Sequence, residues 1–150
     1  MPSLPVIDAW ANLALPRTLD VPQDIRRLFE QAGRGEVLRD GINAEAMIGL
    51  MDRAGLERAM VTVRHHGDSW NTSDQQVRQA VKLFPERLVG VAAVDVEHPV
   101  EAIANLRHAV EDWGFRAMRL VPWLWNCPPN DPRYYPLYTE CVELGIPACT

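Results

Sequence analysis

Cysteine is scarce in this sequence, and long apolar runs are missing from it. The three cysteines, Cys127, Cys141 and Cys149, are odd in number, widely spaced and without a CxxC pair. A disulfide framework or a structural zinc site is therefore not expected, and a reducing cytoplasm is the compartment that fits best. Because no apolar run reaches about 18 residues, no membrane-spanning helix is expected either.

Positive charge is also sparse. The 20 acidic residues outnumber the 15 lysines and arginines, which gives a formal net charge of −5, and the basic residues do not cluster apart from Arg26 and Arg27. We therefore expect no nucleic-acid-binding surface. The length of 150 residues and the hydrophobic fraction of 47% together predict one globular domain over residues 1–150.

Short apolar runs alternate with amphipathic helical stretches along the chain. Helices are predicted at residues 44–54, 73–84 and 99–113 and from Tyr135 onwards, and an earlier one starts near Pro22 and stops at residues 32–35. Buried strands are predicted at residues 59–63, 88–94 and 115–121 and from Ile146 onwards. The strand starts lie roughly 30 residues apart, the length of one βα unit, so we expect a parallel sheet.

Capping residues mark several of these helix ends. Asn43 is a predicted N-cap of the 44–54 helix, and Gly55 is expected to end it. Thr72 or Ser73 is expected to cap the next helix, and Gly145 to end the last one.

A further strand is predicted near the N-terminus, where Val6 and Ile7 follow Pro5. Side chains alternate along a strand, so Asp8, Trp10 and Asn12 are expected on one side of it. At the mouth of a barrel these side chains would serve a functional site; in the plainer interpretation this is a core strand followed by a loop.

Two α/β folds are compatible with this pattern, a doubly wound sheet and a (β/α)8 barrel. A barrel typically needs about 250 residues, so five strands make little more than half of one. A free-standing half-barrel would expose a long apolar edge. The chain is therefore expected to be part of a longer parent, to pair with a copy of itself as a homo-oligomer, or to form a compact five-stranded sheet.

Several segments resemble the amidohydrolase-related family that includes aminocarboxymuconate-semialdehyde decarboxylase and the resorcylate decarboxylases. The segments are VID at residues 6–8, MDRAGLERA at 51–59, FPERLVGVA at 84–92, GFRAMRL at 114–120, YYPLY at 134–138 and CVELGIP at 141–147. The resemblance spans nearly the whole chain. It implies a (β/α)8 barrel of the TIM type, of which this chain is the N-terminal half.

The resemblance also implies a divalent metal such as zinc, bound from a His-x-His motif that ends the first strand. Trp10 and Asn12 stand at those two positions in this sequence. An indole has no lone pair for a metal, and a neutral amide is a poorer zinc ligand than an imidazole. We therefore expect weakened or absent metal use. Asp8 is left as the candidate ligand, with a structural role at the strand end as the alternative.

Polar residues at the ends of the later strands are candidates for catalysis. His65, next to His66, follows the second strand and could carry protons or bind a metal, or it could be a surface histidine. Asp95 ends the third strand and could orient a histidine or bind a substrate hydroxyl, or cap the following loop. Arg119 lies inside a buried strand and could hold a substrate carboxylate, or form an internal ion pair with Asp8 or Asp95.

Two tryptophans of the following loop, Trp123 and Trp125, could wall an aromatic pocket together with Trp10 and Asn12, or cover the loop or a subunit contact. Two functions are then compatible with the sequence. The first is a hydrolase or decarboxylase acting on a small cyclic or aromatic carboxylate, with catalytic residues His65, Asp95 and Arg119. The second is a catalytically inactive fragment or pseudo-enzyme that serves as a binding or assembly module.

Overall fold

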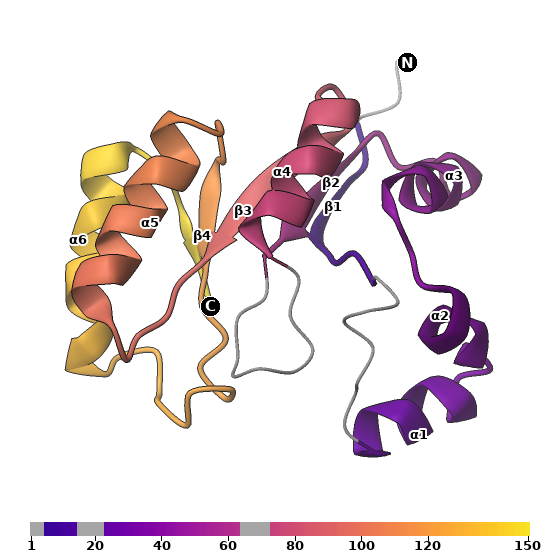
Figure 1. Cartoon of the computed structure of the whole chain (residues 1–150), viewed down its shortest axis with the longest axis horizontal. Coiled ribbons are helices and arrows are strands. Elements are labelled where there is room, and N and C mark those ends of the chain that lie inside the picture. The colour runs from indigo at the N-terminus through magenta and orange to yellow at the C-terminus, as the bar shows by residue number, and fades with distance from the viewer. Residues whose placement is uncertain (1–4, 15–22, 64–72) are drawn as a thin grey trace.

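Five parallel strands follow one another in chain order across one sheet of the computed structural model, which describes residues 5–14, 23–63 and 73–150 (Figure 1). The strands are β1 (Ile7–Ala11), β2 (Arg58–Thr62), β3 (Leu88–Ala93), β4 (Ala117–Arg119) and β5 (Ala148–Cys149). A doubly wound sheet reverses its strand order partway, whereas this order runs β1-β2-β3-β4-β5 without reversal. The structure therefore has the barrel arrangement, and the predicted doubly wound alternative is excluded.

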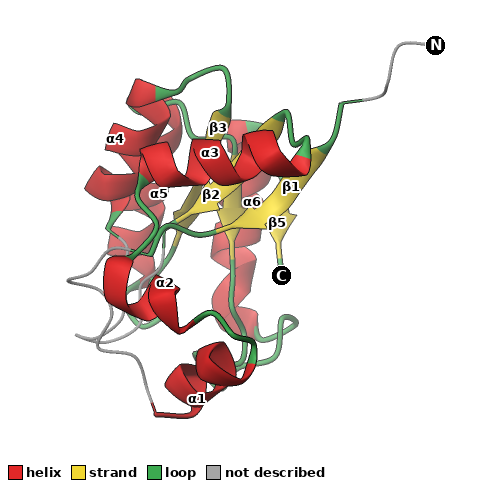
Figure 2. Ribbon diagram, turned by 90° about the vertical axis from the view of Figure 1, so that its right-hand side faces the viewer, coloured by secondary structure: helices red, strands yellow, loops and turns green. Residues whose placement is uncertain are grey.

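The helices connect successive strands. Figure 1 shows α5 and α6 beside the β4–β5 end of the sheet, α3 near the β1 end, and α1 and α2 below the sheet, on the side where the strands end. Figure 2 shows α3 passing in front of the strands, with α1 and α2 set apart from the sheet. The helices are α1 (Gln23–Gln31), α2 (Gly35–Asp40), α3 (Ala44–Ala54), α4 (Asp74–Leu83), α5 (Pro99–Glu111) and α6 (Tyr135–Leu144), with a 3-10 turn, η2 (Pro132–Tyr134), before α6.

Side-chain and glycine caps fix the helix ends as the sequence predicts. The Asn43 side chain accepts a hydrogen bond from the Ala46 N–H at 2.9 Å, and Ser73 forms a reciprocal capping box with Gln76. Gly55 and Gly145 end α3 and α6 with φ of 67° and 65°, values that L side chains rarely adopt. These caps satisfy backbone groups that each helix would otherwise leave without partners.

Two predicted boundaries were wrong, and one helix was missed. The stop expected at residues 32–35 is confirmed, since α1 ends at Gln31, but Gly35 begins α2, a helix the sequence analysis did not predict. The strand expected over 115–121 is regular only in β4, although Arg116 N–H still donates to Gly90 O and Leu120 N–H to Cys149 O. The helix expected to reach Trp113 ends at Glu111.

Two of the segments that carried the family resemblance contact each other at the N-terminal edge of the sheet. Arg87 donates from Nε to the carbonyl of Glu57 at 2.8 Å, and from Nη2 to Asp52 Oδ1 at 2.7 Å. The same Nη2 also lies 3.1 Å from the carbonyl of Leu56. Arg87 thus ties the loop before β3 to the loop before β2, which explains why both segments stand out together.

The hydrophobic core lies between the sheet and its helices, with Phe115, Leu106 and Leu137 fully buried in it. The cysteines carry free thiols, as predicted from their number and spacing. Among the described residues, no helix combines the length and apolar character needed to cross a bilayer.

A close approach in this core makes Gly90 a specific requirement of the fold. A Cβ atom at Gly90 would lie 2.8 Å from Cγ of Phe115 and closer still to Cδ1 and Cε1 of the same ring. We expect Gly90→Ala to lower the free energy of unfolding by about 1–3 kcal/mol, because the ring or the strand must move. Urea unfolding followed by circular dichroism measures the change.

The matched control is Gly49→Ala in α3, where the nearest atom to a new Cβ is Arg53 Nη1 at 3.5 Å. This substitution should raise stability by about 0.5–1 kcal/mol, because it removes a glycine from a helix interior. Equal stability of the two variants would contradict the packing argument.

Candidate functional site

The side chain of Arg119 crosses the inside of the curved sheet from the end of β4 to β1. It is 2% exposed, and its Nη2 donates a hydrogen bond to the carbonyl of Ala9 at 2.8 Å. Its guanidinium carbon lies 3.7 Å from the centroid of the Trp10 ring, a cation–π contact. Arg119 therefore brings the ends of β1 and β4 together at one place.

Two donors of this guanidinium remain unused. Nε and Nη1 are buried, and neither has a hydrogen-bond partner within the described part of the chain. The ion pair with Asp8 or Asp95 that the sequence left open is not formed; the partners are the Ala9 carbonyl and the Trp10 ring. Burial lowers the pKa of Arg119, while Cys149 and Asp8 act weakly in the opposite direction. Arginine stays protonated in proteins, so the site holds a buried positive charge with donors to spare.

An irregularity in β1 presents the carbonyl that Arg119 uses. Asp8 pairs with Ala59 and Ala11 with Val61, so β1 advances three residues where β2 advances two. Within this bulge, Asp8 Oδ1 accepts a hydrogen bond from the Trp10 N–H at 2.8 Å. Bulges often re-aim side chains beside active sites. This hydrogen bond is of the kind that the structural role at the strand end, the alternative to metal binding, calls for.

A cavity of about 70 Å³ opens beside the guanidinium. The hydroxyl of Thr62, at the end of β2, is buried there without a hydrogen-bond partner among the residues described. A cavity of this size suits one small polar group better than a whole substrate, since a water molecule takes up about 30 Å³ of liquid. Its lining comprises Trp10, Asn12, Thr62, Val63, Arg119, Val121, Trp123 and Leu124.

Four of the predicted site residues line this cavity: Trp10, Asn12, Arg119 and Trp123. The sequence analysis missed Thr62, although a polar residue inside a predicted buried strand was the same signal that singled out Arg119.

The remaining predicted residues lie elsewhere. Trp125 is partly buried against the hydrophobic core, and its N–H donates to Pro122 O at 3.2 Å. Asp95 does not line the cavity, and His65 and His66 lie outside the described residues.

Asp95 instead forms a pair with His98, a residue to which the sequence analysis assigned no chemistry. Asp95 Oδ2 lies 2.9 Å from His98 Nδ1, and Oδ1 accepts a hydrogen bond from the Glu97 N–H at 2.8 Å. The hydrogen bond and the negative charge of Asp95 raise the pKa of His98. Asp95 therefore caps the loop after β3 and contacts a histidine, which are two of its three predicted roles, but it does so at the exposed start of α5.

The described residues at the strand ends do not fit a divalent metal. Trp10 and Asn12 stand where the family resemblance implies histidines, and the carboxylate of Asp8 accepts a hydrogen bond from the Trp10 N–H. The cationic Arg119 lies against Trp10 and would repel a second cation. Within residues 5–14, 23–63 and 73–150, no three His, Cys, Asp or Glu side chains are grouped as a metal site.

Comparison with known proteins agrees with the fold. The sequence profile of the family described as "Amidohydrolase" matches residues 7–148. An uncharacterized TIM-barrel protein from Bordetella bronchiseptica superposes with a TM-score of 0.72 at 26% identity, over 97% of this chain and 54% of that one.

Two decarboxylases are similar in structure at lower identity. The 5-carboxyvanillate decarboxylase of Novosphingobium aromaticivorans, solved with manganese and 3-methoxy-4-hydroxy-5-nitrobenzoic acid, has a TM-score of 0.72 at 15% identity, over 96% of this chain and 49% of that one. The 2,6-dihydroxybenzoate decarboxylase of Rhizobium has a TM-score of 0.66 at 17% identity, over 97% and 49%.

The chain thus spans about half the length of these structures, and its five strands correspond to the N-terminal half of a (β/α)8 barrel, as predicted. None of the curated proteins matches the chain.

The Asp95–His98 pair makes a pH-dependent contribution to stability that can be measured. Because the pKa of His98 is raised on folding, this contribution is complete below the ordinary value of about 6.5 and is lost as pH rises through the folded pKa. Asp95→Asn should return the His98 midpoint towards 6.5 in an NMR titration of the imidazole protons. An unchanged midpoint in Asp95→Asn would show that Asp95 does not set this pKa.

Proposed function

Because the chain belongs to the amidohydrolase family, we propose that it forms part of an enzyme that hydrolyses or decarboxylates a small cyclic or aromatic carboxylate. The observation that carries the proposal is the buried guanidinium of Arg119, which keeps two donors without partners in the described structure. Buried polar groups are nearly always hydrogen-bonded, so unused donors beside a cavity call for an explanation. A substrate carboxylate supplies both the acceptors and the opposite charge.

The chemistry of the cavity supports a carboxylate as its occupant. Nε and Nη1 of Arg119 can donate to carboxylate oxygens, and the hydroxyl of Thr62 lines the same space. Hydrogen bonds between ionised partners are roughly twice as strong as those between neutral ones. Asn12 adds an amide that can donate to or accept from a ring hydroxyl.

Aromatic surface surrounds this polar spot. The ring of Trp10 is 51% exposed although one face lies against Arg119, and Trp123 is 70% exposed. Exposed indoles next to a carboxylate-binding cation suit a flat, unsaturated acid, because ring stacking and charge pairing then act on one molecule. Both similar decarboxylases are named for aromatic acids, which favours the same class here. Trp125 lies in the same loop as Trp123, and this is its only link to the proposed pocket.

Proton transfer is assigned to His65 and Asp95, which follow β2 and β3. Strand ends of a barrel carry its catalytic residues, and the pair of Asp95 with His98 offers a carboxylate and an imidazole at one strand end. Arg119 holds and orients the carboxylate; when CO2 leaves, the electron pair of the broken C–C bond stays on the ring carbon, which takes up a proton from the acid. We place the reaction in the cytoplasm, which the free thiols favour.

Metal use is weak or absent in this proposal. A divalent ion such as the manganese of the Novosphingobium enzyme is expected for the family, but the guanidinium of Arg119 takes the place of such a charge at the strand ends. Asp8 would be the metal ligand if an ion bound at all.

A second function is favoured by Trp10 and Asn12 at the positions of the family's histidines. In that alternative the same cavity binds a carboxylate without turnover, as in a pseudo-enzyme or an assembly module. We expect self-association with both functions, because Val6, just before β1, and Ile7, the first residue of β1, are about half exposed. Light scattering would show a homo-oligomer, and turnover of a bound acid would separate the two functions.

Carboxylate binding provides the first test. We expect benzoate and 2,6-dihydroxybenzoate to raise the melting temperature and bind measurably by calorimetry, whereas neutral benzamide should not. Arg119→Met should weaken benzoate binding at least tenfold, about 1.4 kcal/mol, because the charge-assisted hydrogen bonds are lost. Arg119→Lys should restore part of the affinity.

Equal binding of benzoate and benzamide, or an Arg119→Met variant that binds benzoate as the parent does, would contradict the assignment of Arg119. Carbon dioxide release from dihydroxybenzoates and proton release from lactones then test for decarboxylation and hydrolysis.

Metal independence provides the second test. Addition of Mn²⁺ or Zn²⁺ should leave the melting temperature unchanged, and a chelator should leave benzoate affinity unchanged. In Arg119→Met the repulsion is removed, so any weak affinity for Mn²⁺ should increase. Tight binding of Mn²⁺ to the parent protein, with loss of benzoate binding after chelation, would overturn this part of the proposal.

A further inference from the structure

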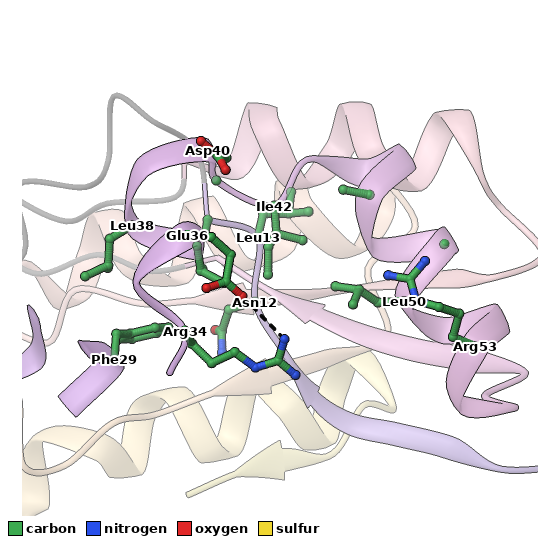
Figure 3. A pocket seen from close by; sticks show the side chains of 15 residues that line it. Asn12, Leu13, Phe29, Arg34, Glu36, Leu38, Asp40, Ile42, Leu50 and Arg53 are labelled. Atoms are coloured by element: carbon green, nitrogen blue, oxygen red, sulfur yellow. Dashed lines mark hydrogen bonds and ion pairs between the residues drawn. The ribbon is translucent and has the colours of Figure 1, made fainter. Parts of the chain in front are cut away.

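A second, much larger cavity lies between the end of β1 and the helices α1, α2 and α3 (Figure 3). Its volume is about 700 Å³, well within the range of about 300–1,000 Å³ that is usual for small-molecule sites. Most of the lining is apolar: Leu13, Phe29, Val37, Leu38, Ile42 and Leu50. The α2 helix, which the sequence analysis did not predict, forms one wall.

Few charged side chains line this cavity, and positive charge predominates among those that form no ion pair with a described residue. Arg34 and Glu36 form a loose pair at 3.5 Å, and Asp40 is held by Arg39. Arg53 lines the cavity and forms no ion pair with another described residue. An apolar group enclosed by these walls meets no unpaired negative charge from the described residues.

The large cavity adjoins the carboxylate site at Asn12. Asn12 lines the 700 Å³ cavity, the 70 Å³ cavity of Arg119, and a third hollow of about 340 Å³. The third hollow shares Ile42 and Leu50 with the large cavity and Trp10 with the small one. All three spaces therefore border the end of β1, and Figure 3 shows Asn12 among the side chains that line the large cavity.

We propose that the substrate is amphipathic: its carboxylate binds Arg119, and an apolar substituent extends past Asn12 into the cavity between α2 and α3. This inference rests on the proposed function and narrows its substrate class. A benzoate-sized acid occupies the Arg119 end alone and leaves the apolar walls of Leu38, Ile42 and Leu50 in contact with water. A substituent of several carbon atoms covers them and gains affinity in proportion to the apolar area it buries.

The test is a homologous series of acids measured by calorimetry on the full chain: benzoate and its 4-ethyl, 4-butyl and 4-hexyl derivatives. Burial of one methylene is worth about a fourfold decrease in Kd, so the butyl acid should bind at least tenfold more tightly than benzoate. The neutral 4-butylbenzyl alcohol shows how much of this gain needs no carboxylate.

Gly49 of α3 supplies a matched pair of variants. It lines the cavity, and a Cβ there meets only Arg53 Nη1, at 3.5 Å, so larger side chains can be introduced without a backbone clash. Gly49→Phe should occupy the part of the cavity beside α3 and reduce the gain from the alkyl chain, yet leave benzoate affinity unchanged. Gly49→Ala adds a single methyl group and should keep the gain. Unchanged benzoate binding also shows that Gly49→Phe is folded.

The outcomes separate this inference from the function on which it rests. If benzoate binds through Arg119 but longer chains bring no gain, the large cavity does not hold the substrate and only the present inference falls. If the gain persists undiminished in Gly49→Phe, the chain lies elsewhere and the inference falls as well. If no acid of the series binds the parent protein, the carboxylate assignment itself is overturned.

Discussion

The contact of Arg119 with the first strand is the interaction on which the candidate site depends. β2 and β3 lie between β1 and β4 in the sheet, so in a flat sheet the two strands would be roughly 14 Å apart. Yet Arg119 Nη2 reaches the carbonyl of Ala9 at 2.8 Å and stacks on Trp10. Only a sheet that curls as a barrel wall allows this reach. The curvature of the sheet is therefore what creates the cavity.

The same contact shows how a strand irregularity serves the site. The bulge in β1 interrupts the regular pairing with β2 and places the Ala9 carbonyl and the Trp10 ring on the same guanidinium. Asp8 stabilises the bulge through the Trp10 N–H. A regular strand would offer Arg119 a carbonyl already used by the ladder, or no ring face at all. The first strand thus contributes shape and an acceptor, while β4 contributes the charge.

Local features of this fold could be predicted from the sequence, and long-range ones only in part. Asn43, Ser73, Gly55 and Gly145 act within one turn of the chain, so their residue types sufficed to place helix ends. The shared location of Trp10, Asn12, Arg119 and Trp123 followed from the rule that parallel strands end at one edge. The hydrogen-bond partner of Arg119 could not be predicted from the sequence. It lies in a bulge 110 residues earlier in the chain, and it is a backbone carbonyl, which no residue type indicates. Similarly, α2 is too short for helical periodicity to be detected, and it forms a wall of the 700 Å³ cavity.

The identity of the cation at the strand ends decides what chemistry the proposed function can include. A metal ion binds a carboxylate and also lowers the pKa of a bound water, so it can both hold a substrate and generate a nucleophile. A guanidinium does only the first, since it donates hydrogen bonds and carries charge but takes no lone pair from water. With Arg119 in this place, activation of water or protonation of a carbon atom must come from side chains that titrate near neutrality. The imidazole of His98, whose pKa is raised by the neighbouring Asp95, is one such group, at the start of α5. Decarboxylation of an activated aromatic acid demands least of such a site, because it needs a held carboxylate and one proton donor, whereas lactone hydrolysis needs a nucleophile as well.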